Sequence, residues 1–223
     1  LFFLGIFLNL NYFKIFIFEH DTLNQKKILR FSLIKFLSRK IIHVVFTPQS
    51  KKLLRKRFNR QAIITNLPII EIKNNKEKKI KKKTILIPTR HHFSKKLIHN
   101  FINKNSEFYF HILSKKSNIR KNLFGNSKKI KLIEFMKNED IKKITAIYLP
   151  LDKDVYKYRI SAWLYNGIAY NKKIILEQNN LYNYEKKRFP NHVILNRKIN
   201  FIKYNFEIKN KFNISKYNRI LIK

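Results

Sequence analysis

The chain of 223 residues has no cysteine, only three glycines and five prolines, and 13 acidic residues against 50 Lys and Arg. Without cysteine, a disulfide framework and a thiolate metal site are excluded, and the composition is compatible with a reducing cytosol. The scarcity of acids gives a formal net charge of +37. Apolar residues still make up 44% of the chain, which is too many for a disordered protein and enough for real cores.

The positive charge has two interpretations. Lys, Asn, Ile, Phe and Tyr recur everywhere while Gly, Ala and Pro are scarce, the pattern expected when a very AT-rich genome dictates the codons. Most lysines then belong to an ordinary solvated surface. The alternative is an anionic partner: nucleic acid, an acidic membrane or a diphosphate.

Residues 1–18 read LFFLGIFLNLNYFKIFIF, about the length that a bilayer requires. Asn9, Asn11 and Lys14 interrupt the run, which favours a buried segment followed by a core strand over a membrane span. The stretch has neither the basic start nor the cleavage site of a signal peptide. Because the chain begins with Leu1 rather than Met, we expect it to be a fragment.

Apolar runs alternate with amphipathic stretches, the pattern of parallel βαβ units. Predicted strands lie at 14–18, 43–47, 62–65, 84–88, 108–113, 129–135, 146–150, 173–176 and 192–196. Helices are expected at 22–40 and after the capping residues Ser50, Ser94, Asn138 and Ser161. The polar run 71–83, EIKNNKEKKIKKK, has little to bury and is predicted to be a linker, with a nucleic-acid-binding arm as the alternative.

The stretch YRISAWLYNGIAYNKKIIL, residues 158–176, places Gly167 inside a predicted helix. Ile160, Trp163, Leu164, Gly167 and Ile168 fall on one face of that helix. Its small residues allow close packing against a sheet, and its first turn exposes N–H groups that can hold a phosphate. An ordinary βα unit explains the small residues equally well.

Three segments together resemble glycosyltransferases of the GT-B fold. The run YLPLDKDVYKYRISAWLYNGIAYNKKIIL is similar to their donor-binding motif, HVVFTPQSKKLL with AIITNLPII to the end of their acceptor domain, and KKTILIPTRHHFSKKLIHNFI to the start of their nucleotide-sugar domain. The resemblance extends from about Phe18 to Ile194. It departs from the family at Ala162, Asn166 and Lys173, where Gly, an acid and Pro are usual.

The resemblance implies an α/β protein with two Rossmann-like lobes of GT-B type, the N-terminal lobe incomplete. We expect a partial acceptor-side domain at 1–70, a charged linker at 71–83, a nucleotide-sugar-binding domain at 84–200 and a C-terminal tail at 201–223. The implied activity is sugar transfer from a nucleoside-diphosphate donor to a hydroxyl of a glycan or lipid-linked acceptor. An inactive, degenerate copy is the alternative within this family.

The family motifs also imply roles for individual residues. Asn166 stands where a donor ribose ligand is expected, without the charge of a carboxylate. His20 or Asp21 corresponds to an acceptor-side base, although Asp21 can equally cap the next helix. The residues expected to bind the donor diphosphate are Arg90, Lys95, Lys96, Arg159, Ser161 and Ala162.

The sequence also excludes several functions. It contains no G-x-S-x-G, Walker or G-x-G-x-x-G pattern, so hydrolase, ATPase and dinucleotide-binding hypotheses have no support. The adjacent His91 and His92 point apart in a strand and have no carboxylate cluster nearby, so we expect no metal site and no cofactor besides the donor substrate.

Two further hypotheses concern partners. A basic nucleic-acid-binding protein is the competing class, but the lysines are spread along the chain and the aromatics fall in core-like runs. Peripheral contact with a membrane is compatible with a sugar transferase acting on a lipid-linked acceptor. The expected location is the cytoplasm, with the inner face of a membrane as the alternative.

Overall fold

The computed structural model describes residues 16–18, 34–36, 41–70, 72, 83–89, 93–114, 128–151, 156–177, 182–196, 206–208 and 212–222. The chain divides into two compact units. The first comprises residues 1–67 with 153–161, and the second comprises residues 68–152 with 162–223. Both units contain a parallel sheet with helices, so the predicted mixed α/β class with Rossmann-like sheets is confirmed.

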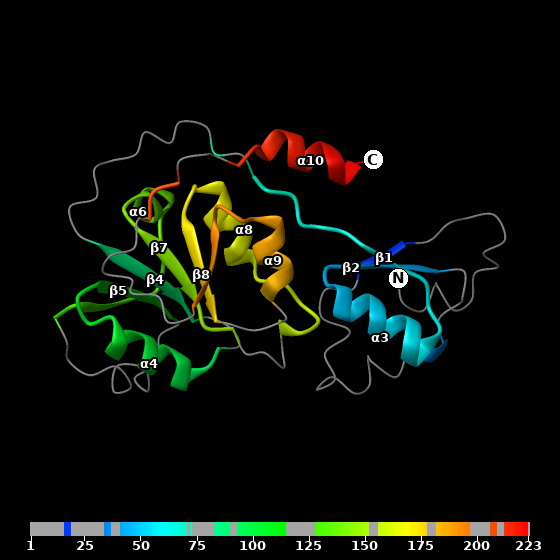
Figure 1. Ribbon diagram of the computed structural model, residues 1–223, viewed down its shortest axis with the longest axis horizontal. Helices are drawn as coiled ribbons and strands as arrows, with labels where there is room; N and C mark the ends of the chain where they lie inside the picture. Colours follow the sequence, from blue (N-terminus) through cyan, green and yellow to red (C-terminus); the bar gives the residue numbers. More distant parts are fainter. Residues whose placement is uncertain are drawn as a thin grey trace. The chain divides into compact units, whose positions relative to one another are not determined.

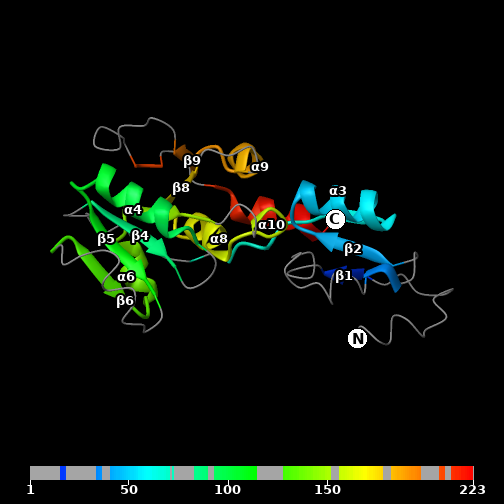
Figure 2. The same cartoon turned by 90° about the horizontal axis from the view of Figure 1, so that it is seen from below.

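The first unit is built on three parallel strands in the order β1-β2-β3. These are β1 (Phe16–Phe18), β2 (Ile42–Val45) and β3 (Ala62–Ile64). Helix α3 (Pro48–Phe58) covers one face of this sheet (Figure 2), where Leu54 and Phe58 pack on Val45. A short 3-10 helix, η1 (Ile34–Phe36), supplies Ile34 to the same core.

Helix α3 begins earlier than the sequence suggested. Thr47 rather than Ser50 is the capping residue, because its Oγ1 accepts the N–H of Ser50 at 3.1 Å. Pro48 then occupies the first turn, where its missing N–H costs nothing. Ser50 instead donates its hydroxyl to the carbonyl of Tyr158 at 3.2 Å.

Residues 156–158 belong to the first unit although they follow β7 of the second. Thr47 donates its hydroxyl to the carbonyl of Lys157 at 3.2 Å, and the Tyr158 ring joins the core beside Leu54. Thr47 and Ser50, at the start of α3, therefore both bind residues 156–158 through hydrogen bonds.

The second unit contains a six-stranded, wholly parallel sheet in the order β6-β5-β4-β7-β8-β9 (Figure 1). The strands are β4 (Thr84–Pro88), β5 (Tyr109–Leu113), β6 (Ile130–Ile133), β7 (Ala146–Leu149), β8 (Lys173–Glu177) and β9 (Val193–Asn196). Numbered from β4, the order is 3-2-1-4-5-6, that of a doubly wound dinucleotide-binding sheet. The central strands are buried on both faces, as continuous runs such as TILIP and AIYL predict.

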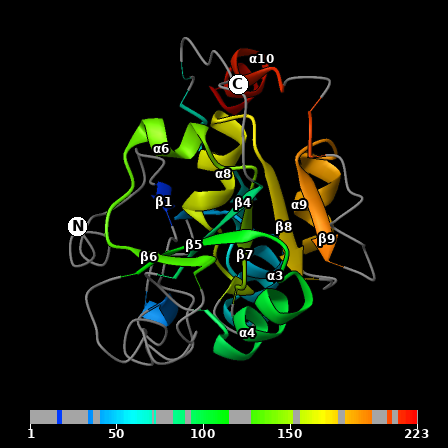
Figure 3. The ribbon, with the colours of Figure 1, turned by 90° about the vertical axis from the view of Figure 1, so that its left-hand side faces the viewer.

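The helices connecting these strands lie on both faces of the sheet. Figure 3 shows α4 (Lys95–Lys104) and α8 (Ala162–Ala169) on opposite sides. The alternation along each strand explains this: Tyr148 and Ile85 point toward Phe101 of α4, while Ile147 points toward α8. The remaining connecting helices are α6 (Asn138–Lys142) and α9 (Asn183–Arg188).

Gly167 lies on the side of α8 that faces the sheet. A Cβ atom at this position would be 2.9 Å from Cγ1 of Ile174 and 3.2 Å from Cδ1 of Ile147. Both isoleucines are fully buried. The glycine is therefore required by helix–sheet packing, one of the two explanations that the sequence left open.

The C-terminal helix α10 (Ile214–Ile222) also belongs to the second unit. Asn218 donates to the carbonyl of Ile69 at 2.8 Å and accepts its N–H at 3.0 Å. Arg188 of α9 donates to the hydroxyls of Tyr165 and Tyr217, at 3.0 and 2.9 Å. These contacts join α8, α9, α10 and the segment at Ile69.

Two details of the sequence interpretation need correction. Lys137 precedes α6 and Asn138 is its first helical residue, with no side-chain cap. Ile160 lies before α8 rather than on its face. The predicted helix 22–40 lies mostly outside the described residues, and its described part forms a 3-10 turn. Among the described residues, none of the helices has the length and apolar character needed to span a bilayer.

Candidate functional site

The candidate site is the carboxyl edge of the six-stranded sheet, where β4 and β7 lie side by side. From β4 the chain crosses to α4 and β5 in one direction, and from β7 it crosses to α8 and β8 in the other. Since parallel crossovers are right-handed, α4 and α8 leave the same edge on opposite faces. Ligands of open α/β sheets bind at this point of divergence.

The start of α4 is fastened to the end of β7. Ser94 caps the helix through its Oγ, which accepts the N–H of Leu97 at 3.4 Å, as the sequence predicted. Its own N–H donates to the carbonyl of Pro150 at 3.0 Å, and Phe93 forms a β-bridge with Leu151. The first turn of α4, with its positive dipole end, is thereby held beside the switch point, the place where the connections from β4 and β7 leave in opposite directions.

Thr89 fixes the end of β4. Its side chain is buried, and both its N–H and its hydroxyl donate to the carbonyl of Leu113, at 2.8 and 2.9 Å. This pairing extends the contact between β4 and β5 by one residue. Thr89 is therefore held rigidly at the carboxyl edge of the sheet.

A polar cluster crosses the carboxyl ends of three neighbouring strands. Tyr148 of β7 donates its hydroxyl to Oε1 of Glu177 at the end of β8, and Asn196 at the end of β9 donates to the same oxygen at 3.0 Å. Tyr148 is also stacked on Phe101, with ring centroids 3.8 Å apart. The Glu177 side chain is half-buried, so its carboxylate is oriented yet can still accept a hydroxyl from a ligand.

Electrostatics reinforce this orientation. Burial, followed by the neighbouring Glu177 carboxylate, raises the pKa of the Tyr148 phenol. The phenol consequently stays protonated and acts as a hydrogen-bond donor to the carboxylate.

Lys95 and Lys96 occupy the first turn of α4 with exposed side chains. Cations at a helix N-terminus are unfavourable for the helix itself, because both the dipole end and the side chains are positive. Together they concentrate positive potential where α4 meets the end of β7. An anionic group such as a phosphate would relieve that repulsion.

The residues predicted around α8 fall on both sides of the division between the units. Ala162 and Asn166 belong to the second unit and are exposed on α8. Arg159 and the buried Ser161 belong to the first unit. The guanidinium of Arg159 lies 5.8 Å from the centre of the Tyr156 ring.

The other predicted site residues, His20, Asp21 and Arg90, lie outside the described residues. Within the second unit the structure thus places Lys95 and Lys96 at the start of α4, and Ala162 and Asn166 on α8, with both helices leaving the same edge of the sheet.

The sequence analysis missed the cluster of Tyr148, Glu177 and Asn196. One signal was available: Glu177 is an acid directly after a predicted strand, in a chain with only 13 acidic residues. The strand order was needed to see that all three residues reach the same edge.

Comparisons with known proteins give one structural similarity to report. No protein-family model matches the chain, and no curated protein sequence matches it either. Among solved structures, the chain is similar to the glycosyltransferase SnogD from Streptomyces nogalater, with a TM-score of 0.33 and 9% sequence identity. The match covers 70% of this chain and 45% of SnogD, so the chain spans less than half of that protein's length.

Proposed function

We propose that the chain is a glycosyltransferase of GT-B type that binds a nucleoside-diphosphate sugar and transfers the sugar to a hydroxyl acceptor. The observation that carries this proposal is the strand order 3-2-1-4-5-6 of the second unit, with α4 and α8 leaving the switch point. Such an edge is where an open α/β sheet receives a nucleotide. Of the residues expected to bind the donor, Lys95 and Lys96 lie on α4, and Ala162 and Asn166 lie on α8.

The chemistry requires stabilisation of negative charge. As the acceptor hydroxyl attacks the anomeric carbon, the bond from that carbon to the diphosphate oxygen breaks and the diphosphate departs as an anion. Preorganised N–H groups and cations are suited to hold that anion. Lys95, Lys96 and Arg90 take this role, assisted by the amide groups at the start of α8 at Ser161 and Ala162, and by Arg159.

The remaining roles follow from residue chemistry. Asn166 hydrogen-bonds the donor ribose. Glu177, oriented by Tyr148 and Asn196, accepts hydroxyls of the donor. His20 or Asp21 removes the proton of the acceptor hydroxyl. The acceptor is a glycan or a lipid-linked saccharide.

Thermal denaturation with a panel of nucleoside diphosphates and nucleotide sugars tests the proposal. A ligand of the native state raises the melting temperature by mass action. We expect Arg90→Ala to abolish the shift and Lys95→Ala to reduce it. Lys104→Ala, an exposed lysine in the last turn of α4, is the matched control and should leave the shift unchanged.

Two outcomes would contradict the proposal. The first is the absence of any nucleotide-induced shift in the wild-type protein. The second is strongly salt-dependent binding of random oligonucleotides without any response to nucleotides, which would favour a nucleic-acid-binding protein.

A further inference from the structure

The first unit carries a basic groove between one flank of α3 and strand β3, beside the face of α3 that packs on Val45. Two adjoining hollows of about 450 and 650 Å³ share the lining residues Lys51, Arg55 and Asn59. These three residues recur at intervals of four and form one stripe along α3 and its C-cap. The other lining residues are Pro48, Lys52, Lys56, Arg60, Gln61, Ala62 and Ile64.

The groove is positively charged and contains no acidic residue among those that line it. The side chains of Lys51, Lys52, Arg55 and Lys56 are all exposed. Arg60 differs, because its buried guanidinium donates to the carbonyls of Ile34 and Lys35, at 3.3 and 2.9 Å. The charge offered to a partner therefore comes from α3.

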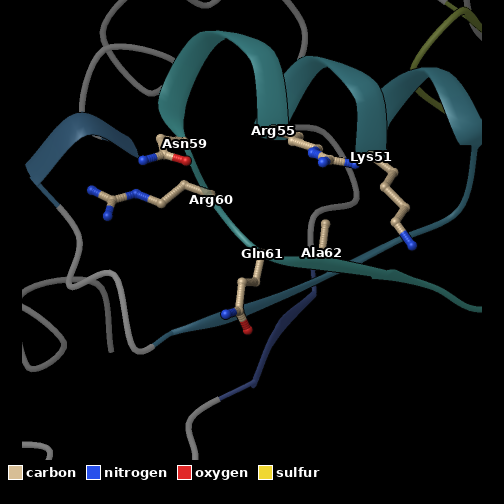
Figure 4. A pocket seen from close by; sticks show the side chains of 6 residues that line it. All are labelled: Lys51, Arg55, Asn59, Arg60, Gln61 and Ala62. Carbon is tan, nitrogen blue, oxygen red and sulfur yellow. The ribbon is translucent and has the colours of Figure 1, made fainter.

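The opposite wall of the groove is an edge of the sheet. In Figure 4, Lys51 extends from α3 toward β3 and Ala62 projects from β3 toward the helix. Within the described residues β3 pairs with β2 alone. The bonds from His43 N–H to the carbonyl of Gln61, and from Thr65 N–H to the carbonyl of Val45, fix which groups face β2. In a parallel sheet, the backbone groups of successive residues point alternately to the two sides of the strand. Those of Ala62 and Ile64 therefore point away from β2.

We propose that this groove binds an acidic segment of a partner protein in extended conformation, which adds to the edge of β3. An added strand would satisfy the outward backbone groups of Ala62 and Ile64. Its side chains alternate between the two faces of the sheet. Those on the α3 side meet Lys51 and Arg55, and those on the other side lie beside Ile63, which is 47% exposed. The partner segment therefore alternates acidic and apolar residues.

Charge complementarity selects this partner over others. A second copy of the chain carries the same formal charge of +37 and is repelled. A single-stranded nucleic acid would use aromatic platforms for its bases, and none of the residues that line the groove is aromatic. An acidic strand uses both the cations of α3 and the strand edge that the described residues leave unpaired.

Fluorescence anisotropy with a labelled peptide of about six residues alternating Glu and Val tests the proposal. Wild-type protein should bind it saturably, with an affinity that falls as salt is added. Arg55→Glu should weaken binding by about tenfold or more, because it reverses a charge in the groove. Arg57→Glu, on the same helix but outside both hollows, is the matched control and should change binding by less than about twofold.

Backbone pairing is tested separately. Ala62→Pro removes an N–H that points away from β2, so the fold should survive, as circular dichroism can verify, while peptide binding falls about tenfold. A peptide N-methylated at alternate residues keeps every charge but cannot form backbone hydrogen bonds with β3. It should bind the wild-type protein as weakly as the unmodified peptide binds the Ala62→Pro variant.

Unchanged binding of the N-methylated peptide would overturn strand addition. Tighter binding of a random oligonucleotide, weakened by Arg55→Glu but unaffected by Ala62→Pro, would overturn the assignment of a peptide partner. Neither result depends on whether the second unit binds a nucleotide.

Discussion

His192, which precedes β9, is buried and neutral in the folded protein. Its Nε2–H donates to Oδ1 of Asn171 at 3.2 Å, and the Phe212 ring lies 6.0 Å away, centroid to centroid. Burial and, secondarily, the charge of Lys173 lower the pKa of His192 from 6.5 to about 4. The side chain therefore links the stability of the second unit to pH.

We predict that stability falls as the pH drops from 6.5 to about 4, because only the unfolded state binds the proton in that window. The stabilisation that comes from keeping His192 neutral is fully present above pH 6.5. Up to about 3 kcal/mol of it is lost when the pH reaches about 4. Urea denaturation of the wild type and His192→Gln at several pH values measures it. The difference in unfolding free energy between the two should shrink toward low pH, and a constant difference would refute the assignment.

Gly167 allows a second prediction at the residue scale. Gly167→Ala should gain about 1 kcal/mol of helix propensity but lose more to the collision with Ile174, for a net cost of about 1 kcal/mol. In an Ile174→Ala background the two closest contacts disappear and only the one with Ile147 at 3.2 Å remains, so the same substitution should cost less than in the wild type. Chemical denaturation of all four proteins gives the coupling energy; additive effects would contradict the packing explanation.

At the scale of elements, Asn218 of α10 pairs with both backbone groups of Ile69. We predict that Asn218→Ala lowers the unfolding free energy by about 1–3 kcal/mol, since two backbone groups lose their partner. Hydrogen exchange at α10 should accelerate. Lys216→Ala changes an exposed side chain on the same helix and should have a smaller effect. Equal effects of the two substitutions would show that the hydrogen bonds between Asn218 and Ile69 do not hold α10 in place.

Most strands could be predicted because each is a short apolar run between polar segments. TILIP and AIYLP became β4 and β7 within one residue. Helix starts were less predictable, because Thr47, Pro48 and Ser50 all suit the first turn and only hydrogen bonds distinguish them. The return of Tyr158 to the first unit is a long-range contact that no local pattern encodes. The pairing of Tyr148 with Glu177 likewise depends on strand order.

At the scale of the whole molecule, 50 basic residues against 13 acidic ones must repel one another. Such self-repulsion destabilises the compact state and is screened by salt. We predict that the melting temperature rises as sodium chloride is added in the absence of ligand. Differential scanning fluorimetry across a salt series measures this; a flat or falling melting temperature would indicate that bound anions or ion pairs already compensate the charge.

The central claim is that the second unit receives a nucleoside diphosphate at the carboxyl edge of its sheet. Hydrogen exchange measured by mass spectrometry, with and without saturating nucleoside diphosphate, tests it most directly. The account predicts protection concentrated in the first turns of α4 and α8 and in the loop after β4. Protection confined to α3 and β3, or no protection with any nucleoside diphosphate, would contradict it.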